Sequence, residues 1–367
     1  MKQKITKKLL KKIVLYPFAV LYGIIVSLRN ALYDGNILKS TFFEVHTICV
    51  GNLAVGGTGK TPMVDYLITL LKTDFTIATL SRGYKRKTTG FLIANQNNNA
   101  EDIGDEPLLY KTKHPEIIVS VDANRVNGIQ KLLQENDAPN IILLDDAFQH
   151  RAVKCELNIV ITEFSNLYIN DTMMPAGFLR EPKTGIRRAD IVIVSKTPES
   201  YTSIEQRTLS KDLKLQAHQQ LFFSWIKYGE LQGFQNKTET ISTLNDLFRY
   251  RIVLFTGIGN PNPLITYLKE YASDVTHVDF PDHHSYTLQD LSNIRNTLDA
   301  YTGGNKIIVT TEKDAMRLRG NDLEDTANSL PLYTIPIEID FKDKTQEFNQ
   351  TINNYVRTNK FYHRKYS

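Results

Sequence analysis

The chain has 367 residues, of which 41% are hydrophobic and 23% are charged, with 19 glycines and 13 prolines. This ordinary globular composition excludes disordered, collagen-like and low-complexity proteins. The length allows two domains, because a single core rarely grows past about 250–300 residues. Two cysteines in a chain this long exclude a disulfide scaffold and a cysteine-rich zinc module, so we expect a reducing compartment.

The positive charge of the chain is local. Residues 1–12 contain six lysines and no acid, whereas the whole chain carries a net charge of +4. Residues 13–367 therefore carry a net charge of −2, and a general nucleic-acid binder is disfavoured.

An uncharged run, IVLYPFAVLYGIIVSL, follows these lysines at residues 13–28. It is shorter than the roughly 20 apolar residues that a membrane-spanning helix needs. Three interpretations compete: a signal peptide, a buried core helix, and a monotopic anchor whose lysines meet anionic headgroups. No convincing cleavage site follows the run, and the lysine cluster argues against a core helix.

The next part of the chain alternates short apolar runs with helical stretches, a pattern typical of a parallel, doubly wound sheet. We predict strands at Val45–Val50, Thr76–Leu80, Ile117–Val121, Asn140–Leu144, Leu157–Ile161 and Ile191–Ser195. Helices are predicted at Pro62–Leu71 and Asn124–Leu133. Residues 197–250 are polar and break the pattern, and we interpret them as a connection with irregular strands.

A second alternating set follows, with strands predicted at Arg251–Thr256, Thr276–Phe280 and Lys306–Thr310 and helices at Pro263–Ala272 and Leu288–Tyr301. We therefore predict a P-loop NTPase-like, doubly wound, mostly parallel sheet, a second, smaller α/β lobe and an N-terminal membrane-anchor helix. The predicted parts are an anchor (1–36), a P-loop core (37–200), a connecting segment (201–250) and a C-terminal lobe (251–367).

The strongest motif is AVGGTGKT, residues 54–61, between the first predicted strand and the first helix. Its small residues let backbone N–H groups face phosphate oxygens, its lysine meets the β- and γ-phosphates, and its hydroxyl suits Mg²⁺. The nucleotide-binding residues predicted from it are Ala54, Val55, Gly56, Gly57, Thr58, Gly59, Lys60 and Thr61. Ala54 departs from the strict pattern, which starts with glycine.

A nucleotide-binding body stays in the cytosol, and this bears on the N-terminal run. If residues 13–28 spanned the membrane, the lysines before them would stay on the cytoplasmic side and the rest of the chain would lie on the opposite side, away from the cytosol. An interfacial anchor keeps both in the cytosol, so we favour it.

Polar clusters follow several predicted strands. Asp145 and Asp146 end the run NIILL, where an acid can hold Mg²⁺ directly or through water, although a helix N-cap is the alternative. The other clusters, each a turn or cap when taken alone, are Ser81–Tyr84, Gly104–Pro107, Asp122–Arg125 and Arg180–Pro182. His283 and His284 suit either a surface loop or a general-base pair with a carboxylate.

Together these segments resemble the tetraacyldisaccharide 4'-kinases of lipid A biosynthesis. The matching segments, in family order, are VGNLAVGGTGKTP (50–62), LSRGYKR (80–86), GDEP (104–107), VDANR (121–125), LDDAFQHR (144–151), PAGFLREP (175–182), GIGNP (257–261), FPDHH (280–284) and TEKDA (311–315). The basic-apolar N-terminus also resembles that family's anchor. Ala147 departs from the pattern, since many members have glycine there.

The resemblance implies a transfer of the ATP γ-phosphoryl group to the 4'-hydroxyl of an acylated glucosamine disaccharide 1-phosphate. It implies that Asp105 accepts the hydroxyl proton with His283, that Lys60, Arg125 and Arg180 stabilise charge, and that Mg²⁺ is the metal. The residues that the resemblance implies as metal ligands are Thr61, Asp145, Asp146 and Glu181. Ser81, Arg82 and His150 are implied to line the same crevice. We expect Asp105 and His283 on separate lobes, which close on ATP binding.

The resemblance also implies a peripheral or monotopic enzyme, held by residues 1–30 at the cytoplasmic face of the bacterial inner membrane. Its expected partners are the lipid substrate and the inner-leaflet surface. Two rivals stay open: a P-loop ATPase or GTPase that drives assembly or metal insertion, and a peripheral membrane scaffold switched by nucleotide. The usual guanine signature is incomplete here, because Ser195–Pro198 lacks its aspartate.

Overall fold

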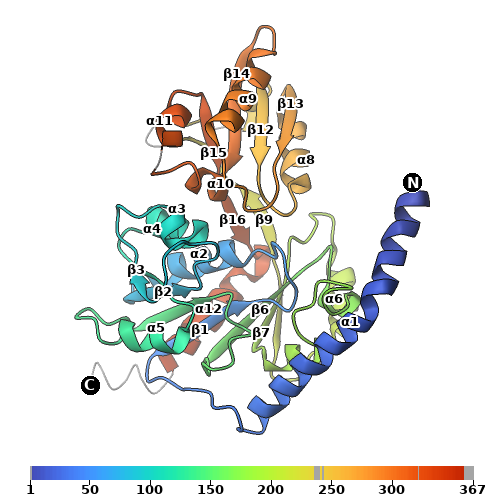
Figure 1. The fold of residues 1–367 in the computed structure, drawn as a ribbon, viewed down its shortest axis with the longest axis vertical. Coiled ribbons are helices and arrows are strands. Elements are labelled where there is room, and N and C mark those ends of the chain that lie inside the picture. Colours follow the sequence, from blue (N-terminus) through green and yellow to red (C-terminus); the bar gives the residue numbers. More distant parts are fainter. Residues whose placement is uncertain (1, 235–239, 242–243, 321, 359–367) are drawn as a thin grey trace. The chain divides into compact units, whose positions relative to one another are not determined.

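The computed structural model describes residues 2–234, 240–241, 244–320 and 322–358. The chain divides into two compact units, each built from separate segments. Unit 1 consists of Met1–Arg82, Ser120–Ile226 and Ile339–Ser367, and unit 2 of Gly83–Val119 and Lys227–Glu338. Each unit has its own sheet, drawn in Figure 1.

The larger sheet begins with the short strand β3 (Leu92–Ile93) and runs in the order β3-β4-β2-β5-β1-β6-β7-β8, and its pairs from β2 to β8 are parallel. Its other strands are β1 (His46–Gly51), β2 (Ile77–Ser81), β4 (Ile118–Val121), β5 (Ile141–Asp145), β6 (Leu157–Glu163), β7 (Ile191–Ser195) and β8 (Gln220–Phe223). Every residue of β1, β2, β5 and β7 is buried, as expected for central strands covered on both faces. This burial explains why the sequence of these strands is almost continuously apolar.

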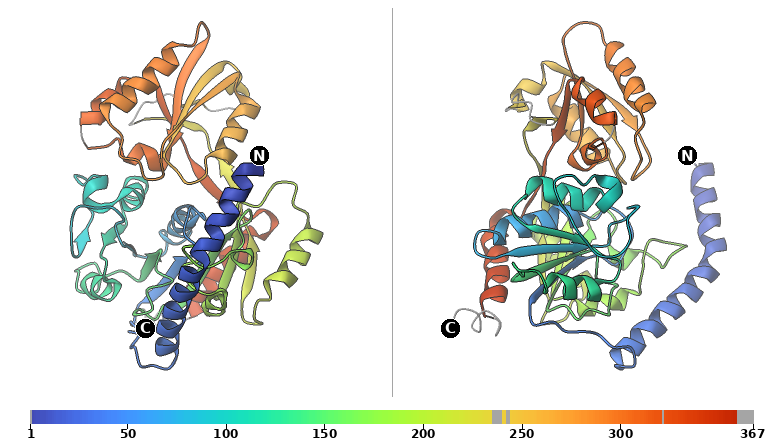
Figure 2. Two further views of the ribbon diagram at one scale, coloured as in Figure 1. Left: turned by 45° about the vertical axis from the view of Figure 1, so that its right-hand side comes forward. Right: turned by 60° about the vertical axis from the view of Figure 1, so that its left-hand side comes forward.

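Helices complete unit 1. They are α1 (Lys2–Asp34), α2 (Lys60–Leu71), α5 (Arg125–Leu132), α6 (Ser203–Leu213) and α12 (Thr345–Thr358), with 3₁₀ turns at Tyr168–Asn170, Lys183–Arg188 and Lys342–Lys344. In the right-hand view of Figure 2, α1 lies to one side of the sheet of this unit. Within α1, Ile13–Asp34 is long and apolar enough to cross a membrane, and 6% of its most apolar window is buried.

The sheet of unit 2 has the order β11-β10-β15-β14-β12-β13; its pairs from β15 to β13 are parallel, and β10 is antiparallel to both of its neighbours. Its strands are β10 (Leu231–Gly233), β11 (Thr240–Ile241), β12 (Tyr250–Thr256), β13 (Asp274–Asp279), β14 (Asn305–Thr311) and β15 (Leu332–Ile335). Unit 2 also contains the short strand β3 (Leu92–Ile93) and the helices α3 (Ala100–Ile103), α4 (Asp105–Lys113), α7 (Leu244–Leu247), α8 (Asn262–Tyr271), α9 (Leu288–Asp299), α10 (Glu312–Met316) and α11 (Asp322–Asn328). Two further strands, β9 (Trp225–Tyr228) and β16 (Ile337–Asp340), pair with each other where the chain passes from one unit to the other.

The predicted strands and helices between residues 45 and 310 are all present, with ends shifted by at most about two residues. Residues 197–250 differ from the expected irregular connection, because they contain α6, β8 and β9. Helix α6 buries only Leu209 and Leu213, so its sequence looks polar. A capping box between Thr202 and Glu205 fixes its start.

Candidate active site

The glycine-rich loop lies between β1 and α2, as its sequence predicts. Gly56 and Gly59 have φ angles of 116° and 93°, values that side-chain-bearing residues rarely adopt. A Cβ added at Gly56 or Gly57 would have nothing within 4 Å, so the backbone there faces open space. Ala54 is not among the residues of positive φ and forms an isolated bridge with Leu179, which explains why alanine is tolerated at that position.

Two side chains hold this loop through Thr58, which is buried. Asn52 Nδ2 donates to Thr58 Oγ1 at 3.0 Å, and Ser195 Oγ at the end of β7 donates to the Thr58 carbonyl at 2.7 Å. These bonds tie the loop to the ends of β1 and β7. A preorganised ring of backbone N–H groups at the start of α2 is suited to bind an anion.

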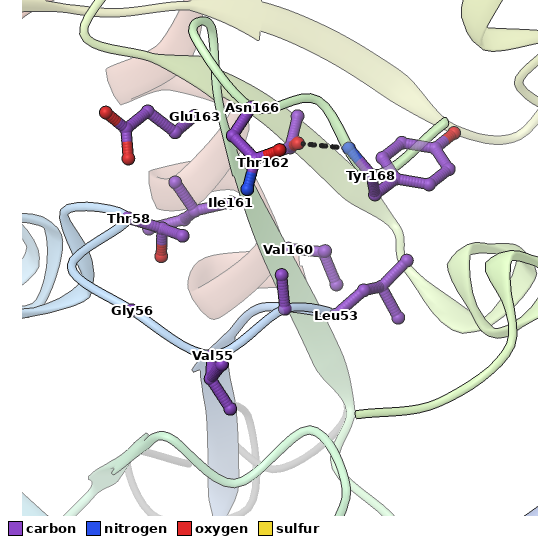
Figure 3. A pocket seen from close by; sticks show the side chains of 11 residues that line it. Leu53, Val55, Gly56, Thr58, Val160, Ile161, Thr162, Glu163, Asn166 and Tyr168 are labelled. Atoms are coloured by element: carbon purple, nitrogen blue, oxygen red, sulfur yellow. Dashed lines mark hydrogen bonds between the residues drawn. The ribbon is translucent and has the colours of Figure 1, made fainter. Parts of the chain in front are cut away.

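A small pocket lies on the β6 side of the loop (Figure 3). It is lined by Leu53, Ala54, Val55, Gly56, Thr58, Val160, Ile161, Thr162, Glu163, Asn166 and Tyr168. Its volume of about 30 Å³ is enough for a water molecule. A nucleotide is far larger, so the open face of the loop at Gly56 and Gly57 is the candidate phosphate site.

The paired acids lie beside this loop, because β5 is a direct neighbour of β1 and Val50 is in register with Asp145. Asp145 is buried, while the Asp146 side chain is 35% exposed. Asp146 has a φ of 49°, and its carboxylate lies 3.7 Å from Lys60 Nζ and 3.0 Å from Arg180 Nη1. Ala147 is not among the residues of positive φ, so the turn does not require glycine there.

Lys60 and Arg180 control the protonation of Asp146. Burial alone would raise the pKa of this carboxyl, but the two cations hold it below its ordinary value. Asp146 therefore stays anionic near neutral pH, between two cations that are themselves suited to phosphate oxygens.

Glu181 is the most enclosed acid of the group, at 1% exposure. Its Oε1 accepts from Gln149 Nε2 at 2.8 Å, and its Oε2 accepts from Arg188 Nη2 at 2.5 Å and from Asn30 Nδ2 at 3.3 Å. A Cβ at Gly185 would lie 2.6 Å from Oε2, so glycine is required there. Glu181 thus orders the side chains around it.

Arg125 and His150 are also enclosed in unit 1. Arg125 is 3% exposed and donates through Nη1 to the Asp122 carbonyl at 3.0 Å and through Nη2 to the Asp145 carbonyl at 3.5 Å. Burial lowers the pKa of His150 to about 4, aided by the positive charges of Arg125, Arg29 and Arg82, so its imidazole is neutral at pH 7.

Five buried polar atoms of the site residues described above have no hydrogen-bond partner among the described residues: Asn52 Oδ1, Ser81 Oγ, Arg125 Nε, His150 Nε2 and Arg180 Nε. Unsatisfied buried donors and acceptors are costly, and they concentrate where a ligand or water completes the network. The described residues contain no group of three or more His, Cys, Asp or Glu that could hold a metal ion. Asp145 and Asp146, adjacent acids at the end of β5, suit Mg²⁺, which takes one or two carboxylates together with substrate phosphates.

Asp105 and His283 both lie in unit 2 and contact each other. His283 Nδ1 is 3.0 Å from Asp105 Oδ2, and our expectation that the two residues lie on separate lobes is wrong. Gly104, with a φ of 94°, precedes Asp105 at the start of α4, and His283 itself has a φ of 57°. Such a conformation in a non-glycine residue is costly and is typical of functional sites.

Arg317 and Lys313 complete the surroundings of Asp105, and our sequence analysis gave neither of them a role. Arg317 donates to Asp105 Oδ2 through Nη2 at 2.6 Å and through Nε at 3.1 Å, while Lys313 Nζ lies 3.9 Å from the same oxygen. Both belong to the helical segment that starts with the motif TEKDA. Two basic residues four apart in such a segment are on one helix face, which was the available signal.

The cations around Asp105 set its protonation. Burial would raise the pKa of this carboxyl, but the His283 hydrogen bond and the charges of Lys313 and Arg317 hold it well below its ordinary range. Arg317 is in turn fixed by Asp314, whose Oδ1 also accepts from Tyr286 at 3.0 Å. Asp105 is therefore anionic at neutral pH and orients the His283 imidazole.

Fold and site together define a nucleotide-binding phosphotransferase of the P-loop class, since a glycine-rich loop with its lysine joins β1 to α2 and acids end the neighbouring strand. A family model described as tetraacyldisaccharide-1-P 4'-kinase matches residues 11–357. The chain belongs to this family and is a kinase.

Similar proteins agree along the whole length. The chain is 46% identical over 352 residues to a tetraacyldisaccharide 4'-kinase of Flavobacterium johnsoniae, covering 96% of this chain and 98% of the relative. It is 45% identical over 354 residues to that of Parabacteroides distasonis, covering 94% of each. A crystal structure of LpxK from Aquifex aeolicus in complex with ATP matches with a TM-score of 0.71 at 30% identity, covering 94% of this chain and 99% of that one. The predicted family, fold class and kinase function are confirmed.

Proposed function

We propose that the chain transfers the γ-phosphoryl group of ATP to the 4'-hydroxyl of a tetraacyl glucosamine disaccharide 1-phosphate through residues of both units. Unit 1 supplies the nucleotide chemistry, and unit 2 supplies the proton acceptor. The observation that carries the first part is Asp146, held between Lys60 and Arg180 beside the glycine-rich loop. Phosphoryl transfer depends almost entirely on such positioning and on charge stabilisation.

In unit 1, backbone N–H groups of residues 54–61 hold the phosphates and Lys60 neutralises the β- and γ-phosphate charge. Arg180 and Arg125 lie near the same acids and stabilise the charge that develops on the transferred group. Ser81, Arg82 and His150 line the surroundings of Arg125.

The residues proposed to hold Mg²⁺ are Thr61, Asp145, Asp146 and Glu181. Mg²⁺ would supply positive charge between the β- and γ-phosphate oxygens. Glu181 would act in the outer part of the site, because its two oxygens already accept three hydrogen bonds.

In unit 2, the Asp105–His283 pair accepts the proton of the sugar hydroxyl. Asp105 fixes the imidazole through Nδ1, and the nearby charges of Arg317 and Lys313 keep Asp105 itself anionic.

Helix α1 places the enzyme at a lipid surface. Its lysine-rich start and its apolar face fit an anionic bilayer surface, with residues 1–30 as a peripheral or monotopic anchor on the cytoplasmic face of the bacterial inner membrane. The acyl chains of the acceptor lie in the bilayer and ATP is in the cytosol, so an enzyme at this surface meets both. The predicted parts 1–36, 37–200, 201–250 and 251–367 then serve as anchor, nucleotide core, connection and C-terminal lobe.

The test incubates purified protein with γ-labelled ATP, Mg²⁺ and the detergent-dispersed disaccharide 1-phosphate. Label in the lipid that is lost in Lys60→Ala and Asp105→Ala supports the proposal. Release of labelled phosphate to water without lipid labelling would instead identify an ATPase, and nucleotide binding without turnover a scaffold switched by nucleotide.

A further inference from the structure

Helix α1 presents two different faces. Large apolar side chains between residues 13 and 28 are each at least 47% exposed: Ile13, Val14, Tyr16, Phe18, Val20, Leu21, Ile24, Ile25 and Leu28. A narrow stripe faces the body of unit 1 instead. Along it Ala19 is buried, the Gly23 backbone lies close to the Met173 side chain, and Tyr22 and Asn30 are partly buried.

The polar residues of this stripe bond to the phosphoryl-transfer residues. Tyr22 Oη donates to the carbonyl of Arg180 at 2.9 Å, and Asn30 Nδ2 donates to Glu181 Oε2 at 3.3 Å. Arg29 Nη2 donates to the carbonyl of Gln149 at 3.1 Å. All these residues belong to unit 1.

Their bonding partners are themselves linked to the nucleotide side. Arg180 Nη1 bonds both oxygens of Asp146, at 3.1 and 3.0 Å, and also lies 3.4 Å from Gln149 Oε1. Gln149 Nε2 bonds Glu181 at 2.8 Å and the Asn52 carbonyl at 2.7 Å. A continuous set of hydrogen bonds thus leads from α1 to the acid beside Lys60.

The apolar packing of α1 against unit 1 is small, since only 6% of its most apolar window is buried. A helix that exposes so many large apolar side chains gains free energy at a lipid surface. If a lipid surface binds α1 only while the helix is packed against the rest of unit 1, the surface stabilises this packed position of the helix.

We propose that α1 is a positioning element of the phosphoryl-transfer site, in which Tyr22, Arg29 and Asn30 hold Arg180, Gln149 and Glu181. Binding of its apolar face to an anionic lipid surface stabilises this arrangement and raises turnover. The stimulation of turnover by lipid rests on the membrane association proposed above. The positioning role of Tyr22, Arg29 and Asn30 does not depend on it.

The first experiment compares kcat and KM of the full-length kinase with those of Tyr22→Phe, Asn30→Ala and the double variant, using MgATP and the detergent-dispersed acceptor. Ser27→Ala is the matched control, because the Ser27 hydroxyl is exposed and donates to the Gly23 carbonyl of the same helix. We expect kcat of the double variant to fall about tenfold, with KM for ATP and thermal unfolding unchanged, because small displacements of positioned groups are expensive.

Asn30→Asp sharpens this test. The substitution puts a second carboxylate against Glu181, so the kcat of Asn30→Asp at pH 8 should lie below that of Asn30→Ala. Asn30→Gln keeps the amide donor and should recover part of the activity. A kcat of the double variant that matches Ser27→Ala, or a loss confined to KM for the lipid, would overturn the positioning role.

The second experiment presents the acceptor in vesicles that contain or lack an anionic phospholipid. Anionic vesicles should raise kcat of the wild type more than that of the double variant, with equal cosedimentation of both proteins. Equal stimulation of both would overturn the coupling. Failure of the proposed function looks different, because the wild type would then leave the lipid unlabelled or would fail to sediment with the vesicles.

Discussion

Asp146 in unit 1 and Asp105 in unit 2 are both carboxylates beside cations, but their surroundings differ. The Asp146 side chain is 35% exposed, and its contact with Lys60 is a loose 3.7 Å. The Asp105 side chain is 6% exposed and accepts hydrogen bonds from Arg317, from His283 and from the backbone N–H of Glu106. The open arrangement can exchange partners with incoming phosphate, whereas the enclosed one keeps its geometry through the reaction.

This contrast predicts that substitutions in the open cluster reduce activity with little change in stability. Lys60→Ala should lower kcat/KM by about 10³-fold or more, because the charge on the transferred phosphoryl group loses its main cation. Thermal unfolding should stay near that of the wild type, since partly exposed ion pairs contribute little to stability. Steady-state kinetics and calorimetry check both points. Lys87→Ala, which removes an exposed ion pair with Glu101, is the control and should retain full activity.

In the enclosed cluster, Asp105→Asn should lower kcat by about 10²- to 10⁴-fold, because the imidazole loses the anion that orients it and favours its protonation. ATP binding should be unaffected, since Asp105 belongs to unit 2 and the glycine-rich loop to unit 1. Single-turnover kinetics and nucleotide titration measure the two quantities. An unchanged kcat, or a loss of ATP affinity as large as the loss of kcat, contradicts the assigned role.

Arg317→Met tests the stability of the enclosed cluster. It leaves Asp105 and Asp314 buried without their main cation, and breaking a buried ion pair from one side costs about 3 kcal/mol or more. Arg295→Met removes an exposed helical pair with Asp299 and should change the free energy of unfolding by less than about 0.5 kcal/mol. Urea unfolding compares the two, and equal effects would show that burial does not distinguish them.

The smallest expected effect is the pH dependence that His150 contributes. Its pKa is about 4 in the folded chain and about 6.5 when unfolded, so the unfolded state binds more protons between these values. Stability should therefore fall as the pH drops from about 6.5 to 4, by about 1 kcal/mol, since His150 is only partly buried. Asp105 has a depressed pKa, so its contribution is present above about pH 4 and is lost only below it. His150→Asn should remove the first phase in pH-dependent urea unfolding and leave the second.

The parts of the molecule that the sequence predicted best are governed by local patterns. Buried strands such as β7 are continuous apolar runs, and the glycine-rich loop needs small residues and a lysine at fixed spacing. Helix α6 was missed because it buries few apolar residues and its start depends on a capping box, not on periodicity.

The site contacts were less predictable because they join residues far apart in the sequence. Arg317 lies 212 residues from Asp105, and Asn30 lies 151 residues from Glu181. No local pattern encodes such pairs. We predicted that Asp105 lies in the P-loop core, because its segment follows β2 in the sequence. In the structure the segment Gly83–Val119 instead belongs to unit 2.

The last helix has a consequence for synthesis. Helix α12 belongs to unit 1, where Tyr66 of α2 donates to Asn349 at 2.7 Å and its ring packs against Phe341 and Phe348. The nucleotide-binding unit therefore lacks part of its core until about nine-tenths of the chain has left the ribosome, whereas unit 2 is complete before that point. Premature termination near the C-terminus would thus leave unit 2 whole and damage the nucleotide-binding unit.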